Sequence, residues 1–453
     1  MADGTLERRT FLGAAAALAG VATALAPRAA AAQPASPLQL RAAEHLVGGA
    51  VDYAYAVKAG PFVFLNGHEA YDFAAGAAPA VEGAAAFPDF GTPPLRREAN
   101  FMLDRMGQIL KSFGTDFAHA VRLDQYYTDP DAVRAYHLAR FASFGKYVPP
   151  STSIITDRCF GKHSTMHTSL VAVMPDPQWE LKPVNPEGSN ISAFSGYAPA
   201  VVANDFVFVA GSGPETKDTQ DTDPTQRWGS VLPIRRQAES ALKQLDKVLK
   251  AAGSSFSSCV KAQVHIAGAE NFPDFVDVWN GAMGDAPPAL TLTPAKAFAR
   301  TTMILEINLI ALKDGAGRKK ELVRAGIPAM ASYSPAVRAG ELVFAPGLMP
   351  LTGEGTVAGL AQGDAFEGLA LKSQLQADQI YSHAEAIAKA AGTSMKNVAR
   401  IDYWVNDIHD FPGVALAWGR RYANAPHPFA CVVTPALPVP GASVMADFWF
   451  YAA

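Results

Sequence analysis

The sequence predicts an α+β protein made of three tandem copies of one domain. Two observations carry this prediction. A block typical of a β-hairpin occurs three times with the same length, at residues 53–67, 197–211 and 333–347. A block with the apolar spacing of an amphipathic helix follows each of these three blocks. Because internal repeats fix the organisation of a chain before any single motif does, the remaining elements are assigned copy by copy.

The first block of each copy predicts two strands joined by a tight turn. A short strand leads to Ala-Gly or Ala-Asn, which is typical of a turn, and the apolar run Phe/Leu-Val-Phe follows. Each block closes on a glycine, where the backbone can approach another chain or a ligand. These glycines are Gly67, Gly211 and Gly347.

The second block predicts a helix with one apolar face. In the first copy the apolar stripe is Met102, Met106, Ile109 and Phe113, and equivalent positions are apolar in the other copies. This spacing places the residues on one face of an α-helix. A glycine follows each stripe where the left-handed residue after a helix belongs, at Gly114, Gly253 and Gly392.

The rest of each copy completes the order β-β-α-β-α-β-β. A strand opens at Arg122, Lys261 and Arg400, and a second helix is expected around residues 132–144, 273–283 and 412–422. Two extended runs close each copy, at 152–155 and 165–173, 289–293 and 301–312, and 430–434 and 443–451. The predicted domains are residues 51–175, 191–313 and 327–453, and the segments 175–190 and 313–326 are predicted linkers.

The first 32 residues predict a signal peptide. Arg8 and Arg9 precede the apolar stretch 11–26, and the small residues 29–32 offer a cleavage site before Gln33. The pattern resembles a twin-arginine (Tat) signal, with an ordinary Sec signal as the alternative. We therefore expect a periplasmic or secreted protein.

Composition excludes several classes of protein. Apolar residues make up 49% of the chain, and 38 Lys+Arg against 42 Asp+Glu give a formal charge of -4. This composition excludes a disordered chain and argues against a nucleic-acid partner. No apolar run beyond residue 40 is long enough to span a bilayer. Three cysteines, Cys159, Cys259 and Cys431, form no disulfide framework, and buried thiols are expected.

The repeated blocks resemble the RidA (YjgF/endoribonuclease L-PSP) family. The resembling segments are Ala-Val-x-Ala-Gly-x-Leu-Val-Phe (336–344), the Ala-Ala-Gly helix ends and the closing strand 305–311. The resemblance implies a chorismate mutase-like fold and ligand clefts between neighbouring subunits of a homotrimer. Three tandem copies then imply a monomer that forms an intramolecular pseudo-trimer. Such a fused chain lets its three clefts diverge, which a symmetric homotrimer cannot do.

Active members of the family hydrolyse enamines and imines, and an arginine on the first closing strand holds the substrate carboxylate. The matching positions are Thr152, Leu290 and Ala430, so none of the three copies keeps this arginine. Thr291 is the nearest polar residue in the second copy, and Thr152 and Thr291 become candidate substrate contacts. Arg300 lies ten residues too late in the register to match.

The family also places a glutamate on the last strand, near the water that attacks the imine. The matching residues are His167, Glu306 and Met445. Glu306 is a candidate general acid/base, with an ion-paired strand glutamate as the alternative. Since Met445 cannot transfer protons, the third site is expected to be inactive or remodelled.

The first copy carries most of the ionisable groups. His68, Glu69 and His167 could converge as an acid/base set, or as two histidines and a carboxylate that bind a metal. Histidines with no catalytic role are the alternative. Arg158 is a candidate replacement for the missing anion-binding arginine.

Tyr126 and Trp404 occupy matching positions on the third strand of their copies. They are candidates for lining a cleft for an aromatic ligand, and the alternative is that they pack under the helices.

These features predict a periplasmic enzyme that acts on a small organic molecule by acid/base-assisted hydrolysis or lyase chemistry. No cofactor is expected. The alternatives are a non-catalytic protein that binds a small metabolite, and a metal-dependent hydrolase that uses the first domain.

Overall fold

The structure is a computed structural model that describes residues 37–43, 52–72, 76–82, 92–187, 196–219, 233–285, 287–328, 336–359, 371–423 and 425–453. The predicted signal peptide at 1–32 lies outside these residues, as does Tyr333 at the start of the third hairpin block. The described residues belong to one compact unit, Ser36–Ala453. No helix within these ranges has the length and apolar character needed to cross a membrane.

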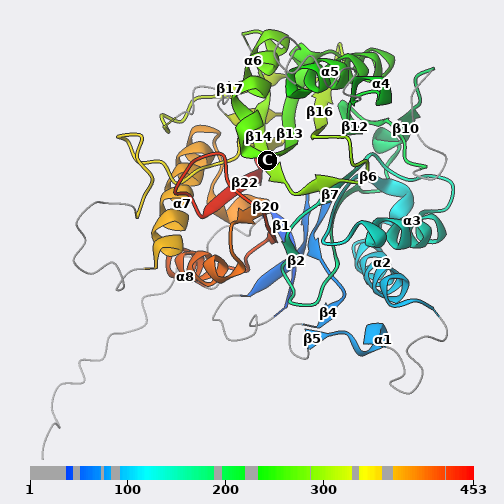
Figure 1. Ribbon diagram of the computed structural model, residues 1–453, viewed down its shortest axis with the longest axis horizontal. Coiled ribbons are helices and arrows are strands. Elements are labelled where there is room, and N and C mark those ends of the chain that lie inside the picture. The colour runs from blue at the N-terminus through cyan, green and yellow to red at the C-terminus, as the bar shows by residue number, and fades with distance from the viewer. Residues whose placement is uncertain are drawn as a thin grey trace, which may run out of the picture. The chain divides into compact units, whose positions relative to one another are not determined.

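Three sheets with paired helices form three lobes of the same design (Figure 1). In lobe 1 the strand order is β1-β2-β3-β9-β6-β7. The two long helices of this lobe are α2 (Pro94–Ser112) and α3 (Pro130–Phe144). The strands are β1 (Leu38–Ala43), β2 (Tyr53–Ala59), β3 (Phe62–His68), β6 (Ala120–Tyr127), β7 (Ser151–Ile155) and β9 (Met166–Val173). Smaller elements of this lobe are β4 (Tyr71–Asp72), β5 (Gly76–Ala77) and α1 (Pro79–Glu82).

Lobes 2 and 3 repeat this order. In lobe 2 it is β10-β11-β12-β16-β13-β14, and in lobe 3 it is β17-β18-β19-β22-β20-β21. Lobe 2 consists of β10 (Leu181–Val184), β11 (Ala200–Ala203), β12 (Phe206–Ser212), α4 (Thr216–Thr219), α5 (Pro233–Ala251), β13 (Cys259–Ala267), α6 (Phe272–Met283), β14 (Ala289–Ala295) and β16 (Leu305–Leu312). Lobe 3 consists of β17 (Lys320–Val323), β18 (Ala336–Ala339), β19 (Leu342–Phe344), α7 (Lys372–Ala390), β20 (Val398–Val405), α8 (Phe411–Arg421), β21 (Phe429–Val433) and β22 (Val444–Tyr451). The predicted α+β class and the three repeated units are confirmed.

The predicted linkers are wrong in part, because each contains a strand. β10 lies within 175–190 and β17 lies within 313–326, and each pairs in antiparallel fashion with the first strand of the hairpin that follows. Both strands lie at a sheet edge, where a proline such as Pro183 is tolerated. The prolines and charges that suggested linkers are therefore features of edge strands.

The hairpin turns explain the recurring Ala-Gly and Ala-Asn pairs. Ala59 pairs with Phe62, Ala203 with Phe206 and Ala339 with Leu342, which leaves two-residue turns. The first turn residue is left-handed in every lobe: φ is 57° at Gly60, 53° at Asn204 and 60° at Gly340. Glycine and asparagine adopt this conformation most readily, and a two-residue hairpin requires it.

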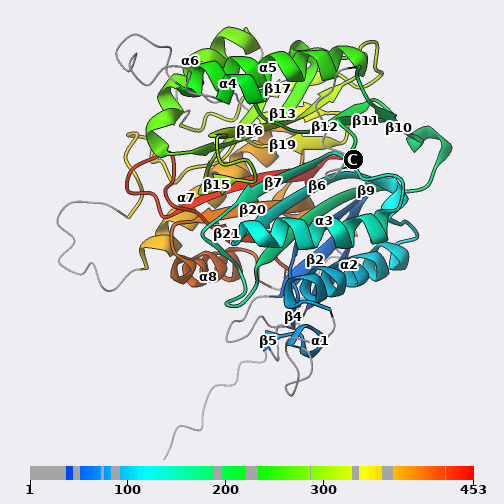
Figure 2. The same cartoon turned by 45° about the vertical axis from the view of Figure 1, so that its right-hand side comes forward.

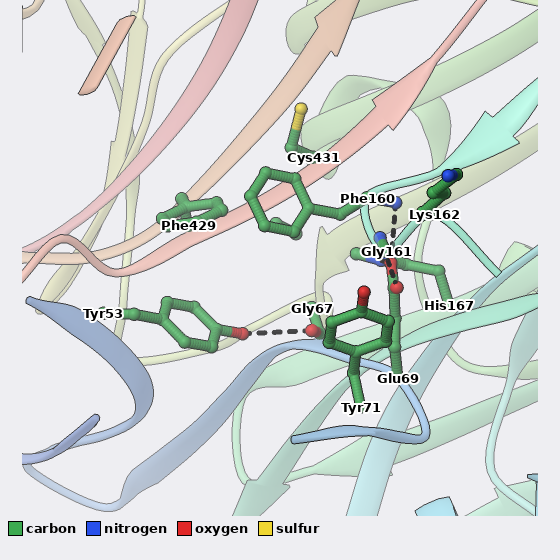
Figure 3. A pocket seen from close by; sticks show the side chains of 11 residues that line it. Tyr53, Gly67, Glu69, Tyr71, Phe160, Gly161, Lys162, His167, Phe429 and Cys431 are labelled. Atoms are coloured by element: carbon green, nitrogen blue, oxygen red, sulfur yellow. Dashed lines mark hydrogen bonds and ion pairs between the residues drawn. The ribbon is translucent and has the colours of Figure 1, made fainter. Parts of the chain in front are cut away.

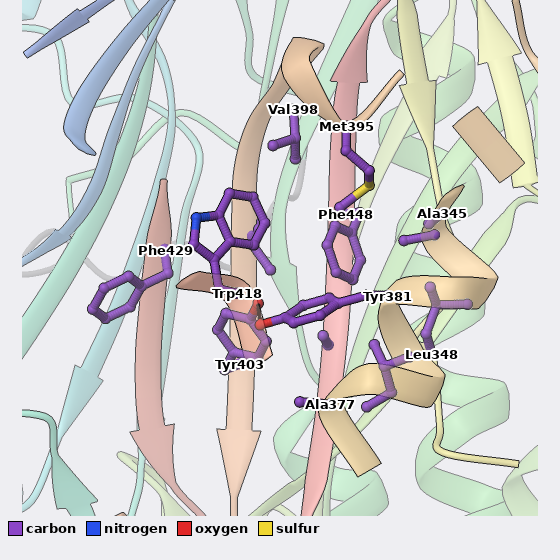
Figure 4. Close-up of a cluster of buried hydrophobic side chains, with 14 of the residues drawn as sticks. Ala345, Leu348, Ala377, Tyr381, Met395, Val398, Tyr403, Trp418, Phe429 and Phe448 are labelled. Carbon is purple, nitrogen blue, oxygen red and sulfur yellow. Dashed lines mark hydrogen bonds between the residues drawn. The ribbon is translucent and has the colours of Figure 1, made fainter. Parts of the chain in front are cut away.

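One face of each sheet packs against its helix pair. In lobe 3 the ring of Tyr381 on α7 lies near Tyr403 on β20, and the two hydroxyls are 2.9 Å apart (Figure 4). Trp418 on α8 and Phe448 on β22 belong to the same buried cluster. The apolar helix faces predicted from the sequence thus cover the sheets.

Contacts between lobes follow a cyclic order. β15 (Ala297–Phe298) of lobe 2 extends the lobe 1 sheet by pairing with β7 (Figure 2). β8 (Arg158–Cys159) of lobe 1 extends the lobe 3 sheet by pairing with β21. In lobe 3 the N–H of Gly347 donates to the carbonyl of Leu290 in lobe 2 at 3.0 Å. Each copy therefore contacts both of the others.

A buried network of charges joins the three lobes. The matching strand positions Arg122, Lys261 and Arg400 supply three cations, and Asp124, Asp402 and Asp447 supply three carboxylates. Arg400 reaches across to Asp124 at 2.8 Å, and Lys261 pairs with Asp447 at 2.8 Å. Since the opposite charges are equal in number, the network holds no uncompensated charge, which would be costly at such buried positions.

Candidate functional site

The cleft between lobes 1 and 2 contains a cavity of about 420 Å³. Ser151 and Ser153 on β7 line it from lobe 1, and Gly211, Arg300 and Glu306 line it from lobe 2. The cavity contains charged and hydroxyl-bearing groups from both lobes, so it can hold a polar small molecule.

Burial shifts the pKa of Glu306 in this cleft, as it lowers that of His137 and raises that of Tyr197 in the same lining. Glu306 lies on β16 and keeps some accessible surface because it faces the cavity, but it is surrounded by protein atoms. Burial raises its pKa from 4.5 to about 7, although the N–H of Ser153, 3.3 Å from Oε1, and the charge of Arg300 act in the opposite direction. A carboxyl group with this pKa can both accept and donate a proton near neutral pH.

Gly211 at the end of β12 makes room for this carboxyl group. A Cβ atom at position 211 would lie 1.9 Å from Oε1 of Glu306, so no larger residue fits while the carboxyl keeps its place. This is the close approach that the hairpin glycine predicts.

Arg300 supplies a guanidinium to the same cleft. Nη2 donates to the carbonyl of Pro214 at 2.8 Å and Nη1 donates to Oγ1 of Thr216 at 3.3 Å. Within the described ranges no acidic side chain forms an ion pair with Arg300. Strand register excluded this residue from the site, whereas the structure places it in the wall of the cavity beside Glu306.

Thr152 does not line this cavity, although Ser151 and Ser153 do. Its Oγ1 accepts a hydrogen bond from Nδ2 of Asn308 at 3.0 Å, and its side chain is buried. Alternation along β7 explains the difference, since neighbouring residues of a strand point to opposite faces.

A second cavity, of about 180 Å³, lies between lobes 1 and 3 (Figure 3). Gly67, Glu69 and His167 line it from lobe 1, and Phe429 and Ala430 on β21 line it from lobe 3. A Cβ atom at Gly67 would lie 3.0 Å from Cε1 of His167. Gly67 and His167 thus occupy the positions that Gly211 and Glu306 occupy in the first cleft.

Glu69 and His167 form a buried carboxylate–imidazole pair. Oε1 of Glu69 is 2.7 Å from Nδ1 of His167, and the carboxylate also accepts the N–H groups of Phe160 at 2.8 Å and Gly161 at 2.7 Å. Nε2 of His167 is buried and has no hydrogen-bond partner. In the tautomer that donates Nδ1–H to Glu69, the lone pair of the ring lies on Nε2.

His68 does not join this pair, so the expected convergence of three groups is wrong. Its Nε2 lies 2.9 Å from the carbonyl of Tyr55, and burial lowers its pKa to about 3. Successive residues at a strand end point to different sides, and this separates His68 from Glu69. The trio therefore does not fit a metal ion, and the described ranges contain no cluster of three or more potential metal ligands.

The contact between lobes 2 and 3 is filled by side chains. A Cβ atom at Gly347 would lie 3.1 Å from Cγ2 of Thr291 and 3.4 Å from Sδ of Met445. Oγ1 of Thr291 lies 2.8 Å from Nζ of Lys261 and 2.9 Å from a carboxylate oxygen of Asp447. Thr291 is therefore part of the buried charge network, which contradicts its expected role as a substrate contact.

Tyr126 and Trp404 line neither cavity. They pack in an apolar cluster drawn from all three lobes, together with Phe298 and Met445. The alternative of packing under the helices is also wrong, because the neighbouring Tyr127 and Tyr403 belong to the clusters on the helix side. Alternation along the strands sends Tyr126 and Trp404 to the opposite face.

Arg158 also lies outside both cavities. It sits on β8, which pairs with β21 opposite Val433, and this pairing holds it at the lobe 1–3 sheet junction. Sequence reasoning missed the neighbours that do line the cavity, Phe160 and Gly161. Their only sequence signal is their position between the two predicted closing runs, 152–155 and 165–173.

Comparisons with known proteins agree with this architecture. The family model described as endoribonuclease L-PSP matches residues 187–313 and 324–445. Protein DfrA of Myxococcus xanthus is 30% identical over 112 residues, which cover 24% of this chain and 78% of DfrA. A RutC family protein of Pyrococcus horikoshii is 27% identical over 120 residues, covering 26% of this chain and 87% of that protein.

Two solved structures are also similar. A putative endoribonuclease of Thermotoga maritima has 26% sequence identity and a TM-score of 0.24, covering 30% of this chain and 98% of its own. A chorismatase has 13% identity and a TM-score of 0.40, covering 60% of this chain and 79% of its own. Because the family model matches more than half of the sequence, in two consecutive copies, the chain belongs to the endoribonuclease L-PSP (RidA/YjgF) family.

Proposed function

We propose that this protein is an enzyme that processes a small organic molecule in the lobe 1–2 cleft, by hydrolysis or lyase chemistry that Glu306 assists as acid and base. The observation that carries the proposal is a carboxyl group with a pKa raised to about 7 on the wall of a 420 Å³ cavity. A carboxyl group that has a raised pKa, faces a cavity and lacks an ion-pair partner among the described residues is the kind of group that serves in proton transfer.

Arg300 suggests the substrate class. A guanidinium with no acidic partner in the described ranges can bind a carboxylate through two parallel hydrogen bonds. The lost family arginine on β7 would then be replaced by an arginine from the segment that precedes β16. The substrate we propose carries a carboxylate next to a polar double bond, as a 2-imino acid does.

Hydrolysis of such an imine needs one proton acceptor and one proton donor. Ionised Glu306 takes a proton from a water molecule, and the water oxygen attacks the carbon of the C=N bond. The electron pair of that bond moves to nitrogen, which receives a proton from the now neutral Glu306. After proton transfer from the new hydroxyl, the C–N bond breaks, and one imine and one water give one carbonyl compound and one ammonia.

The test measures ammonia release from a panel of 2-imino acids, with amides and lactones of similar size assayed for hydrolysis. The variants are Glu306→Gln and Arg300→Lys, and Glu321→Gln on the exposed strand β17 is the matched control. Glu306→Gln should lower kcat/KM at least a hundredfold and remove an inflection of the pH–rate profile near pH 7. Arg300→Lys should raise KM more than it lowers kcat, because it weakens carboxylate binding.

If the Glu306→Gln variant hydrolyses any substrate of the panel as fast as the wild type, the assignment of Glu306 is wrong. Equal losses in the Glu321→Gln control would show that the effect is not specific to the cleft.

We also propose that the enzyme works as a monomer in the periplasm. Support comes from the cyclic contacts among the three lobes within one chain and from the twin-arginine pattern at Arg8 and Arg9. Size-exclusion chromatography with light scattering should give the mass of one chain. Cell fractionation should find the protein in the periplasm, and replacing both arginines by lysine should retain it in the cytoplasm.

A further inference from the structure

We propose that the lobe 1–3 cleft is a second ligand site, separate from the one at Glu306, that takes a single uncharged aromatic ring bearing a hydroxyl group. The ring would lie against the aromatic side chains of the two lobes, and its O–H would donate to Nε2 of His167. This assignment concerns different residues from the proposed catalytic cleft and stands independently of it.

The size of the cavity sets the size of the ligand. Its volume is about 180 Å³. An apolar protein cavity of roughly 150 Å³ binds one benzene molecule. The lobe 1–3 cavity therefore holds one six-membered ring with a small substituent and has no room for a second ring.

The walls suit the face of an aromatic ring. Phe160 comes from lobe 1 and Phe429 from lobe 3, and their ring centroids are 5.4 Å apart. Tyr53 packs on Phe429 with a centroid distance of 4.7 Å. In Figure 3 these three rings lie on one side of the site, and Glu69 and His167 lie on the other. Tilted and edge-to-face contacts of this kind favour another aromatic ring over a flexible chain.

The polar end of the site offers a hydrogen-bond acceptor. Glu69 already accepts the N–H groups of Phe160 and Gly161, so its position is fixed before any ligand enters. It holds Nδ1 of His167 at 2.7 Å, and Nε2 is left buried without a partner. A buried acceptor without a donor costs free energy, and a ligand hydroxyl removes that cost.

Charge at the site favours an uncharged ligand. The carboxylate of Glu69 lies in the wall. In the tautomer that donates Nδ1–H to this carboxylate, Nε2 of His167 presents a lone pair to the site. An anionic ligand in this cavity would be repelled by the Glu69 carboxylate and by the lone pair on Nε2 of His167. The cation among the lining residues is Lys162, which is exposed and therefore well solvated. A carboxylate ligand would accordingly bind less well than a neutral phenol.

The experiment titrates the full-length protein with phenol, anisole and benzoate in a calorimeter. These probes share one ring and differ in the group that would face His167: a donor, a methyl ether and an anion. Anisole and benzoate should each bind at least fivefold more weakly than phenol, since neither donates a hydrogen bond at neutral pH. This comparison needs no variant, so it does not depend on a variant that folds.

Matched substitutions then locate the site. His167→Phe keeps a ring but removes Nε2, and it should raise the Kd for phenol about tenfold. His68→Phe makes the same change at the adjacent buried histidine, outside the cavity, and Glu306→Gln changes the other cleft. Both controls should leave the Kd for phenol within twofold of the wild-type value.

A nitrogen-15 NMR spectrum of histidine-labelled protein adds a direct readout. Phenol should shift the Nε2 resonance of His167, assigned by its absence in the His167→Phe variant, and leave that of His68 unchanged. Equal affinity for phenol and anisole, tighter binding of benzoate, or an unchanged Kd in a folded His167→Phe variant would each overturn the proposal.

Discussion

Replacing Glu306 with glutamine should stabilise the protein at alkaline pH and have little effect at acid pH. The pKa of Glu306 rises from 4.5 in the unfolded chain to about 7 in the folded protein, because burial disfavours the charged form. Between these two pH values the unfolded chain loses its proton first, so the folded state becomes progressively less favourable as the pH rises. Glutamine keeps an oxygen that can accept the N–H of Ser153 and has no proton to lose.

The magnitude follows from the shift of the pKa. Each pKa unit corresponds to about 1.4 kcal/mol, so a shift of this size is worth roughly 3 kcal/mol once the pH exceeds both values. At pH 5 the unfolded chain has already lost part of its Glu306 proton, so part of this free-energy difference is present before the pH rises. Water in the cavity lowers the cost of burying the charged carboxylate. We therefore expect the stability difference between Glu306→Gln and wild type to grow by about 2 kcal/mol from pH 5 to pH 8.

The assay is urea unfolding followed by circular dichroism at pH 5, 6, 7 and 8 for the wild type, Glu306→Gln and the surface control Glu321→Gln. The free energy of unfolding of Glu306→Gln minus that of the wild type should increase with pH and level off above pH 7. The control should track the wild type at every pH. A difference for Glu306→Gln that stays constant over this range would show that the carboxyl titrates normally, and the argument for its catalytic use would fail.

Three further predictions address the packing around the sites. Gly211→Ala should displace the Glu306 carboxyl and lower the free energy of unfolding by about 1–3 kcal/mol, as measured by urea unfolding. The control is Gly281→Ala on the exposed surface of α6, where a Cβ atom meets no neighbour. This change should be neutral or stabilising in the same assay. Asp447→Asn should cost about 3–5 kcal/mol by the same assay, because it leaves Lys261 buried without its counter-charge. Cys159 and Cys259 are free, buried and outside both cavities, so a thiol reagent should modify neither in the native protein and both in urea. Rapid modification of either one in the native protein would contradict the packing.

The fold could be predicted because its signals are local and repeat three times. Aligning the copies placed His167, Glu306 and Met445 at one position of the fold, and the structure finds each of them against the hairpin glycine of its own lobe. A single copy would have left the register uncertain by a residue or two. Agreement among three copies removes that uncertainty, because one register has to satisfy all of them.

The sites were harder to predict because side chains from different copies form them. Matching strand positions between copies placed Arg300 outside the site. This comparison covers only residues within a sheet, whereas Arg300 lies in the segment before β16, which forms part of the cavity wall. Position alone suggested that Thr291 faces substrate, but a lysine and an aspartate from two lobes engage its hydroxyl. His68 and Glu69 are adjacent in sequence, yet His68 bonds to the carbonyl of Tyr55 and Glu69 bonds to His167.

Fusion of the three copies explains why these sites differ. In a symmetric trimer a substitution appears in every cleft, so a change that improves one site alters all three. Here the same hairpin glycine faces an imidazole in one cleft, a carboxyl in the second and a thioether in the third. The third contact is packed with apolar and charge-paired side chains, so it can stabilise the assembly while the other two keep buried ionisable groups that weaken it. A chain that carries Glu306 with a raised pKa and an unpartnered His167 nitrogen needs such a closed interface more than a trimer with three identical clefts does.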